Sequence, residues 1–350
     1  MADGSSWVLV GNMPEDRGGH TSVVYDGKIW VIGGLNSSSA TTHTILSSID
    51  GIAWTQVSSN FPAGLSGNRH TSESYDNKMW IIGGMTDAYG TSDAAYYSTD
   101  GITWTPSTVL PVARRMHSSV IYPLSGVDRM WVIGGQGAQS VYYWTAGSGW
   151  TNLGNTLPAI RFMHSSVAFD GKIWVIGGYG AQNVYSSVDG VNWTDHGNVL
   201  PKTVYEHRTV VYDGKMWILG GNDSSTNTML RSVYSSVDGV NWIEAGGTGY
   251  DALPEARQSH SSVIYDNRVW VIGGYYPPGS SVRDTVYATE QDIPVCWNYT
   301  ARYKNSNKLF KLSGPGLFPK NLRVPSNVDE LTGKMIDDGI IVSPKKYTIN

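Results

Sequence analysis

Cysteine, charged residues and long apolar runs are all scarce in this sequence. Its single cysteine, Cys296, excludes an internal disulfide framework and any metal site built from several cysteines. No stretch approaches the roughly 18 consecutive apolar residues of a membrane span, so we expect no transmembrane segment. The opening residues, MADGSSWVLV, lack the basic and apolar regions of a signal peptide. We therefore expect synthesis in the cytoplasm, while the final location stays open and includes a virion or another extracellular particle.

Charge and composition narrow the class of protein further. The net charge is −4, which gives no reason to expect attraction to nucleic acid. Charged residues make up only 15% of the chain, whereas there are 41 glycines, 14 tryptophans and 21 tyrosines. This mixture is typical of many short strands joined by tight turns, and it predicts an all-β protein.

One pattern occurs six times along the chain. A histidine opens a run rich in β-branched and aromatic residues, a tryptophan follows, and a pair of glycines ends the segment, as in HTSVVYDGKIWVIGG from His20. The segment from His117 carries four extra residues in its turn and otherwise agrees. The histidines lie about 50 residues apart, which indicates a repeat architecture. They are His20, His70, His117, His164, His207 and His260.

Each repeat predicts four strands. Asp-Gly or Asp-Asn between two β-rich runs forms a two-residue turn, so each segment is expected to be a hairpin. A third strand follows the glycines, and four repeats then carry a turn of the form S-x-D-G-x-x-W, such as Ser98-Thr-Asp-Gly-Ile-Thr-Trp104. The third repeat has Ala146-Gly-Ser-Gly-Trp150 instead. Four strands per repeat correspond to one blade of a β-propeller.

The two ends of the repeat array predict how the ring closes. An apolar residue and a proline follow each tryptophan strand, and the first such pair, Met13-Pro14, follows Trp7 near the start of the chain. The sixth repeat loses its pattern after Tyr287. We therefore predict a six-bladed propeller over residues 1–289, whose N-terminal strand completes the last blade and removes exposed sheet edges. Residues 290–350 are predicted to form a separate, extended or β-rich C-terminal tail.

These residues resemble the kelch-repeat family, in which a glycine pair follows a strand, an aromatic residue lies downstream and a tryptophan closes each unit. The resemblance covers about residues 5–289. The S-x-D-G-x-x-W turns depart from the common kelch form and look like the Asp-box of bacterial sialidases and related propellers. In such proteins this turn is structural and lies away from the active site. The resemblance therefore supports a fold rather than an activity.

The loops that lead into each blade are candidates for binding, because function in a propeller tends to lie on loops held by a rigid scaffold. An arginine precedes the histidine by three residues in four repeats. Such a ring could bind a carboxylate or a glycan, but the repetition of the position favours bonds to backbone carbonyls of a neighbouring blade. The candidates are Arg17, Arg69, Arg114, Arg115, Arg161, Glu206 and Arg257, with the aromatic residues Tyr179, Tyr275 and Tyr276.

The repeated histidines do not predict a metal site. A metal needs three or four ligands that converge on one point, whereas six equivalent positions are spread around a ring. Each histidine is instead expected to satisfy backbone groups between blades. We predict no metal, no cofactor and no catalytic residue. The open alternative is a carbohydrate-binding or carbohydrate-active propeller, similar to a sialidase or a sugar mutarotase, that uses the arginine-lined face.

The C-terminal tail differs in charge from the propeller. Residues 288–350 hold nine Lys or Arg against six Asp or Glu, and they include aromatic residues that disordered linkers usually lack. We therefore predict an arm that docks onto a protein partner by adding strands to another sheet, with packing against its own propeller as the alternative. The candidate contact residues are Tyr303, Lys304, Lys308, Phe310, Lys311, Phe318, Lys320 and Arg323.

The favoured function is a non-catalytic binding and assembly module. A rigid propeller with a short docking arm is similar in layout to structural components of virions and phages, an analogy from architecture alone. We expect a protein partner in a larger assembly, contacted through the tail, and a glycan as a further candidate ligand. No nucleic-acid partner is predicted.

Overall fold

The computed structural model describes residues 7–58, 61–245, 252–277 and 281–290 in full, and beyond them the backbone of four strands. The chain divides into two compact units. One comprises Gly4–Glu290, and the other comprises Gln291–Asn350 with Met1–Asp3. No helix in the described residues is long and apolar enough to cross a membrane.

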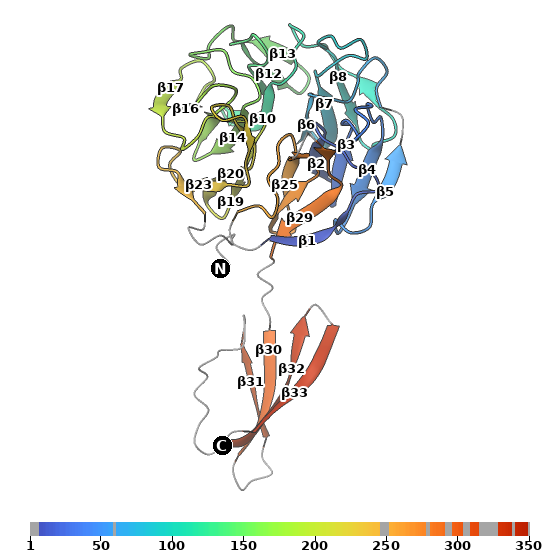
Figure 1. Cartoon of the computed structure of the whole chain (residues 1–350), viewed down its shortest axis with the longest axis vertical. Helices are drawn as coiled ribbons and strands as arrows, with labels where there is room; N and C mark the ends of the chain where they lie inside the picture. Colours follow the sequence, from blue (N-terminus) through green and yellow to red (C-terminus); the bar gives the residue numbers. More distant parts are fainter. Residues whose placement is uncertain are drawn as a thin grey trace. The chain divides into compact units, whose positions relative to one another are not determined.

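The larger unit confirms the all-β propeller predicted from the repeats (Figure 1). Its described residues form six four-stranded antiparallel sheets, one for each repeat. The innermost strands of neighbouring sheets contact one another around a closed ring. We number these sheets as blades one to six in chain order.

Each blade has four strands, and they are named here from the innermost to the outermost. Blades one to three are β2 (Thr21–Tyr25), β3 (Lys28–Ile32), β4 (Ile45–Ser48), β5 (Thr55–Ser58); β6 (Thr71–Tyr75), β7 (Lys78–Ile82), β8 (Ala95–Ser98), β9 (Thr105–Pro106); β10 (Ser118–Leu124), β11 (Val127–Ile133), β12 (Val141–Thr145), β13 (Gly149–Asn152). Blades four to six are β14 (Ser165–Phe169), β15 (Lys172–Ile176), β16 (Asn183–Ser187), β17 (Thr194–Asn198); β19 (Arg208–Tyr212), β20 (Lys215–Leu219), β23 (Val233–Ser236), β24 (Ile243–Glu244); β25 (Ser261–Tyr265), β26 (Arg268–Ile272), β29 (Thr285–Thr289), β1 (Trp7–Asn12). Short strands in the loops are β18 (Val204–Tyr205), β21 (Asn222–Asp223), β22 (Thr228–Met229), β27 (Tyr275–Tyr276) and β28 (Ser281–Val282).

The N-terminal strand completes the sixth blade. β1 runs antiparallel to β29, with Trp7 opposite Thr289 and Asn12 opposite Thr285. The outer strand of blade six therefore comes from the start of the chain, as the position of Trp7 and Met13-Pro14 predicts. This pairing covers the edge that β29 would otherwise expose.

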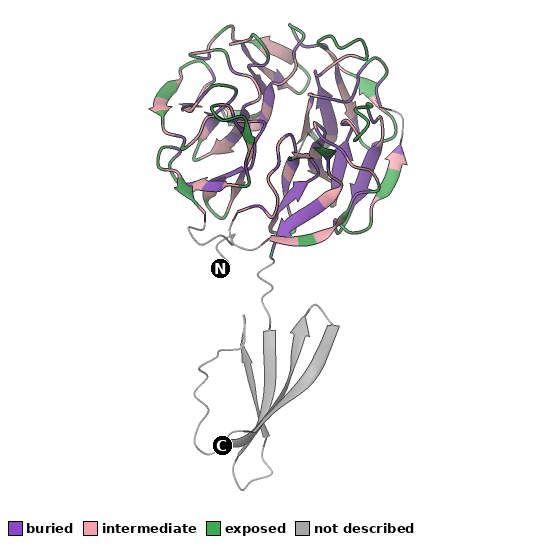
Figure 2. Cartoon of the chain, viewed as in Figure 1, coloured by how far each residue is buried: buried purple, intermediate pink, exposed green. Residues whose placement is uncertain are grey.

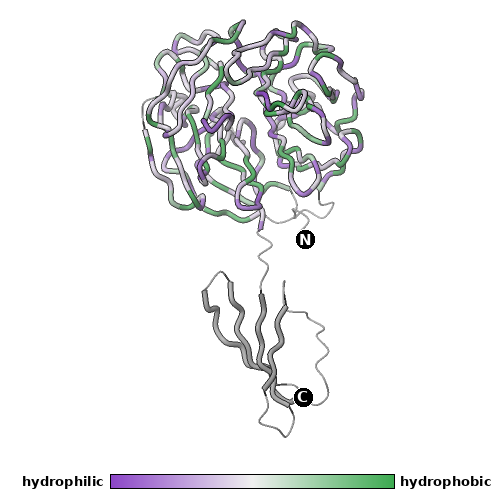
Figure 3. The backbone as a smooth tube through the Cα atoms, turned by 180° about the vertical axis from the view of Figure 1, so that it is seen from behind, coloured by the Kyte–Doolittle hydropathy of each residue, from purple (hydrophilic) through white to green (hydrophobic). Residues whose placement is uncertain are grey.

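The hydrophobic core lies between the blades. In β15, Ile173, Trp174, Val175 and Ile176 are all buried, because both faces of the strand are covered by neighbouring blades. The second strands of the other five blades end in the same buried run. Burial is concentrated in the second and third strands of the blades, and exposure in the outermost strands and the connecting loops (Figure 2). Along the backbone of the propeller, hydrophobic and hydrophilic stretches alternate (Figure 3).

The S-x-D-G-x-x-W turns join adjacent blades. In blade four, Ser187 Oγ accepts the N–H of Gly190 at 2.8 Å, and Asp189 Oδ1 accepts two further N–H groups at 2.8 Å. This geometry presses Gly190 against the ring of Trp131 in blade three. The turns of blades one, two and five meet the tryptophan of the preceding blade in the same way. The turn is thus a structural joint, as the resemblance implies.

Two blades lack this turn and fill the space with another tryptophan. Blade three places Trp144 against Trp80 of blade two, with 4.6 Å between the ring centroids. In blade six, Trp7 packs against the cluster that contains Trp217 of blade five. Large aromatic rings therefore replace the glycine contact where the Asp-Gly sequence is absent.

The smaller unit contains one antiparallel sheet, which agrees with the β-rich form of the predicted tail. Its four strands are β30 (Cys296–Tyr303), β31 (Leu309–Gly314), β32 (Val328–Asp337) and β33 (Ile340–Thr348), arranged in the order β31-β30-β32-β33. β31 and β33 are the outer strands, so each has one side along which another strand could be added.

Candidate functional site

Six loops connect the outermost strand of one blade to the innermost strand of the next. In each loop, the residue before the repeat histidine has a positive φ between 50° and 69°, which non-glycine residues seldom adopt. Its N–H donates to the carbonyl oxygen of the equivalent residue in the preceding blade, at N···O distances of 2.9 to 3.4 Å. These bonds form a closed ring, which we call the mouth ring. Its members are Gly19, Arg69, Met116, Met163, Glu206 and Ser259.

An ion pair spans the mouth ring. Arg69 of blade two pairs with Glu206 of blade five, which lies on the opposite side of the channel. Ser259 Oγ also donates to Glu206 Oε2 at 2.5 Å. Glu206 is buried and Arg69 is 27% exposed. The structure therefore brings together two of the candidate residues that the sequence indicates, and it joins them across the channel.

The repeat histidines form a second ring just inside the first. His20, His70, His117, His164 and His207 each place Nε2 within 2.8 to 3.0 Å of a serine or threonine hydroxyl in the preceding blade. The partner is thus a side-chain hydroxyl, where the sequence predicted backbone groups. His260 is the exception, because neither of its ring nitrogens has a hydrogen-bond partner among the described residues.

Burial keeps the histidine ring neutral. Desolvation lowers the pKa of His70, His164 and His207 to about 3. It also lowers the pKa of the other three repeat histidines well below its ordinary value. The ring therefore contributes hydrogen bonds between blades and no charge near neutral pH.

The four repeat arginines lie inside the protein rather than on a binding face. Arg17, Arg114 and Arg257 each donate from Nη1 to the carbonyl of the first glycine of the pair in the blade that their loop enters, at 2.7 to 3.1 Å. Arg161 instead bonds the hydroxyl of Tyr185 at 2.7 Å. All four are buried. The sequence favours hydrogen bonds from these arginines to backbone carbonyls of a neighbouring blade. Three of them do bond a backbone carbonyl, but it belongs to the blade that their own loop enters.

Loss of one such arginine should be costly. We expect Arg17→Met to lower the free energy of unfolding by about 2–4 kcal/mol, because it leaves the buried carbonyl of Gly33 without its donor. Arg115→Met is the matched control, and its effect should stay within about 0.5 kcal/mol because its bonds lie at the surface. Urea unfolding of both variants measures the difference. Equal losses would refute the structural role of Arg17.

Other predicted residues lie on the loop surface. Arg115 donates to the carbonyl of Tyr89, which is 80% exposed. Tyr179 is 56% exposed, whereas Tyr275 and Tyr276 are half-buried in β27. Exposed tyrosine and arginine side chains are common at the centres of protein interfaces. This loop face therefore offers residues suited to contact a partner.

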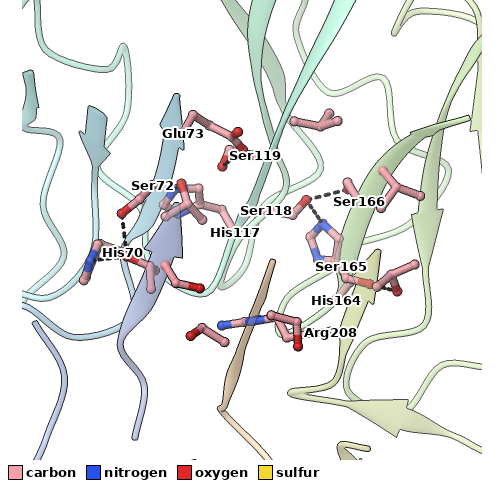
Figure 4. A pocket seen from close by; sticks show the side chains of 18 of the residues that line it. His70, Ser72, Glu73, His117, Ser118, Ser119, His164, Ser165, Ser166 and Arg208 are labelled. Atoms are coloured by element: carbon pink, nitrogen blue, oxygen red, sulfur yellow. Dashed lines mark hydrogen bonds between the residues drawn. The ribbon is translucent and has the colours of Figure 1, made fainter. Parts of the chain in front are cut away.

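The channel behind the mouth ring holds a cavity of about 410 Å³ (Figure 4). Its wall is rich in hydroxyl groups because successive positions of the innermost strands are serine or threonine. These strand residues are Thr21, Ser22, Thr71, Ser72, Ser118, Ser119, Ser165, Ser166, Thr209, Ser261 and Ser262, and Ser259 of the mouth ring adds a further hydroxyl.

Two charged residues of this cavity are not among the candidates that the sequence indicated. Glu73 lies on β6 and accepts a hydrogen bond from Ser119 Oγ at 2.6 Å. Burial raises the pKa of Glu73 to about 7. Arg208 lies on β19, and Figure 4 shows its side chain extending into the cavity. The signal was present in the repeats, since HTSESYD and HRTVVYD depart from their relatives at these positions.

The predicted tail residues are only partly described. Tyr303 is the last residue of β30, and Phe310 and Lys311 lie in the outer strand β31. The remaining five, Lys304, Lys308, Phe318, Lys320 and Arg323, lie outside the described residues. The role of the tail residues stays a prediction.

Comparison with known proteins identifies the repeats. The profile of the KLHDC2/KLHL20/DRC7 kelch-repeats domain matches residues 69–274, and that of the kelch motif matches residues 16–50. Among solved structures, YjhT is similar with a TM-score of 0.62 and 14% sequence identity, over 81% of this chain and 100% of that chain. At this identity the similarity concerns the fold alone. No curated protein sequence matches the chain.

Proposed function

Because this chain belongs to the kelch-repeat propeller family, a family of protein-interaction modules, we propose that it is a non-catalytic assembly component. In this proposal the propeller is displayed on a larger complex, such as a virion, and the C-terminal unit anchors it. The protein partner of the anchor lies in that complex.

The division of the chain is the observation that carries this proposal. Gly4–Glu290 is one unit, closed by its own N-terminal strand, and Gln291–Asn350 belongs to a second unit with its own sheet. Since the propeller needs no strand from the second unit to complete a blade, that unit is free to serve another purpose. The outer strands β31 and β33 can accept a strand from a partner.

Capture from source material tests the proposal. The full-length chain and a chain that ends at Glu290 are immobilised and exposed to the same lysate. We expect the full-length chain to retain a defined large assembly and the shorter chain to lose it, while both keep the same thermal unfolding of the propeller. Retention of the same partner by the shorter chain would place the contact on the propeller and refute the anchoring role.

A carbohydrate-binding role on the loop face is the second candidate. The number of candidate residues for this role is smaller than the sequence indicates, because four of them are buried: Arg17, Arg114, Arg161 and Arg257. Arg69 and Glu206 are engaged with each other, which leaves Arg115 as an arginine of that set at the surface. A sugar on this face would therefore depend on exposed tyrosines, and the assembly role is the better supported of the two.

A further inference from the structure

The innermost strands obey a strict pattern that is broken twice. Their first residue carries a hydroxyl in five blades, and in blade five it is Arg208. The residue two positions further along is valine in five blades, and in blade two it is Glu73. Blades two and five face each other across the ring, and both exceptions line the same cavity. A cation and an acid have thus replaced residues that serve the fold in every other blade.

Arg208 makes no direct ion pair in the described part of the chain, and the Glu206 carboxylate raises its pKa only from beyond ion-pair distance. Its hydrogen bond to protein is a long one, 3.5 Å to the carbonyl of His207. No carboxylate among the described residues lies within ion-pair distance of its guanidinium. Burial lowers the pKa of Arg208, which reflects the loss of water around the charge. An unpaired cation inside a protein is costly unless something compensates it.

The substitution also breaks a bond elsewhere. In the other blades, the hydroxyl at this position is the partner of the histidine in the next blade. Because Arg208 supplies no such hydroxyl, His260 is left without a partner for either ring nitrogen in the described part of the chain. The fold therefore loses stability twice at one residue, and such departures are typical of functional sites.

The net charge of the cavity would be balanced by a ligand that carries one negative charge. Arg69 and Glu206 neutralise each other at the mouth, and the histidine ring is neutral. Glu73 is only partly ionised near neutral pH, so Arg208 leaves a net positive charge of up to one. A singly charged anion would balance it, whereas a doubly charged phosphate would leave an excess.

We propose that the channel cavity binds a small hydroxycarboxylate, with its carboxylate on the Arg208 guanidinium and its hydroxyl groups on the serine and threonine rings. Arginine pairs with a carboxylate through two parallel hydrogen bonds. Glu73, on the opposite wall, can donate to a ligand oxygen when it is protonated. The volume of about 410 Å³ lies within the range of small-molecule sites. This site is independent of the proposed anchoring by the C-terminal unit.

Calorimetry on the full-length chain tests the site with a matched pair of probes. D-gluconate carries one carboxylate and several hydroxyl groups, and sorbitol keeps the hydroxyl groups without the charge. We expect saturable heat with gluconate in the millimolar range or below, and binding of sorbitol that is weaker by at least about tenfold, as expected for loss of a charge-assisted pair.

Arg208→Ser is the decisive variant because it restores the residue found at this position in other blades. It should weaken gluconate binding by at least about tenfold. It should also raise the midpoint of thermal unfolding of the unliganded protein, because the new hydroxyl can pair with His260. Arg231→Ser, at an exposed arginine that does not line the cavity, is the control and should leave binding unchanged.

Two results would overturn the proposal. One is the absence of saturable gluconate binding to the wild-type chain at millimolar concentration. The other is binding that is equally strong in wild type and Arg208→Ser. In the second case, a rise in thermal stability of Arg208→Ser would make Arg208 a merely unfavourable residue of the wall.

Discussion

Replacement of Gly190 by alanine is expected to lower the free energy of unfolding by about 3 kcal/mol, which combines backbone strain with overpacking. The Cβ atom would lie 2.3 Å from the ring of Trp131, and φ at this position is +71°. Trp131 is fully buried between blades three and four, so its ring has no space into which to move. The turn of blade four would have to separate from blade three.

Gly171→Ala provides the matched control. Its φ is +67°, close to that of Gly190, but an added Cβ would meet no atom within 4 Å. We therefore expect this variant to be destabilised only by the strain of the left-handed conformation, by about 1 kcal/mol. Urea unfolding of the two variants side by side isolates the contact with Trp131. If both variants lose the same stability, the turns do not join the blades and the packing argument fails.

Glu73→Val should stabilise the propeller by about 2 kcal/mol at pH 8 and much less at pH 4.5. Valine is the residue that the other five blades carry at this position. Burial raises the pKa of Glu73 to about 7 in the folded protein, above the ordinary value of 4.5. The folded state therefore binds more protons than the unfolded chain between these two pH values.

The sign of this effect follows from proton linkage. Because the folded state holds the extra proton, the free energy of unfolding falls as pH rises from about 4.5 to about 7, and the full cost of ionising Glu73 is present above that window. Valine removes the cost. Chemical unfolding of wild type and variant at both pH values gives the difference, and other titrating groups largely cancel. A gain that does not depend on pH would show that Glu73 is not held protonated by its surroundings.

The propeller could be predicted from sequence because its determinants repeat. Each glycine pair and each tryptophan of the hairpin occurs in register with five relatives, and five of the six hairpins share an Asp-Gly or Asp-Asn turn, so several weak signals add up to one strong one. The position of Trp7 and Met13-Pro14 even indicates which strand closes the last blade. The C-terminal unit has no repeat, and its local alternation of residues predicted β structure without revealing the order of its strands.

The binding candidates were harder to predict, since repetition itself was misleading. Arg17 and Arg257 recur because each, like Arg114, donates to the carbonyl of the first glycine in its own blade, so they serve the fold. Glu73 and Arg208 do not recur, and their place in the wall of the channel cavity is seen only in the structure. The positive φ of Met116 and Met163 has no sequence signal either, because the mouth ring of hydrogen bonds imposes it.

The pairing of β1 with β29 determines when the propeller can be completed during biosynthesis. β1 is the first strand of the propeller to leave the ribosome, and its partner is the last. At typical rates of translation the gap is of the order of half a minute. During that time β1 has no partner, while blades one to five can form in turn. The ring is sealed only when the ribosome has reached the C-terminal unit, so a nascent chain presents that unit and its finished propeller at nearly the same moment.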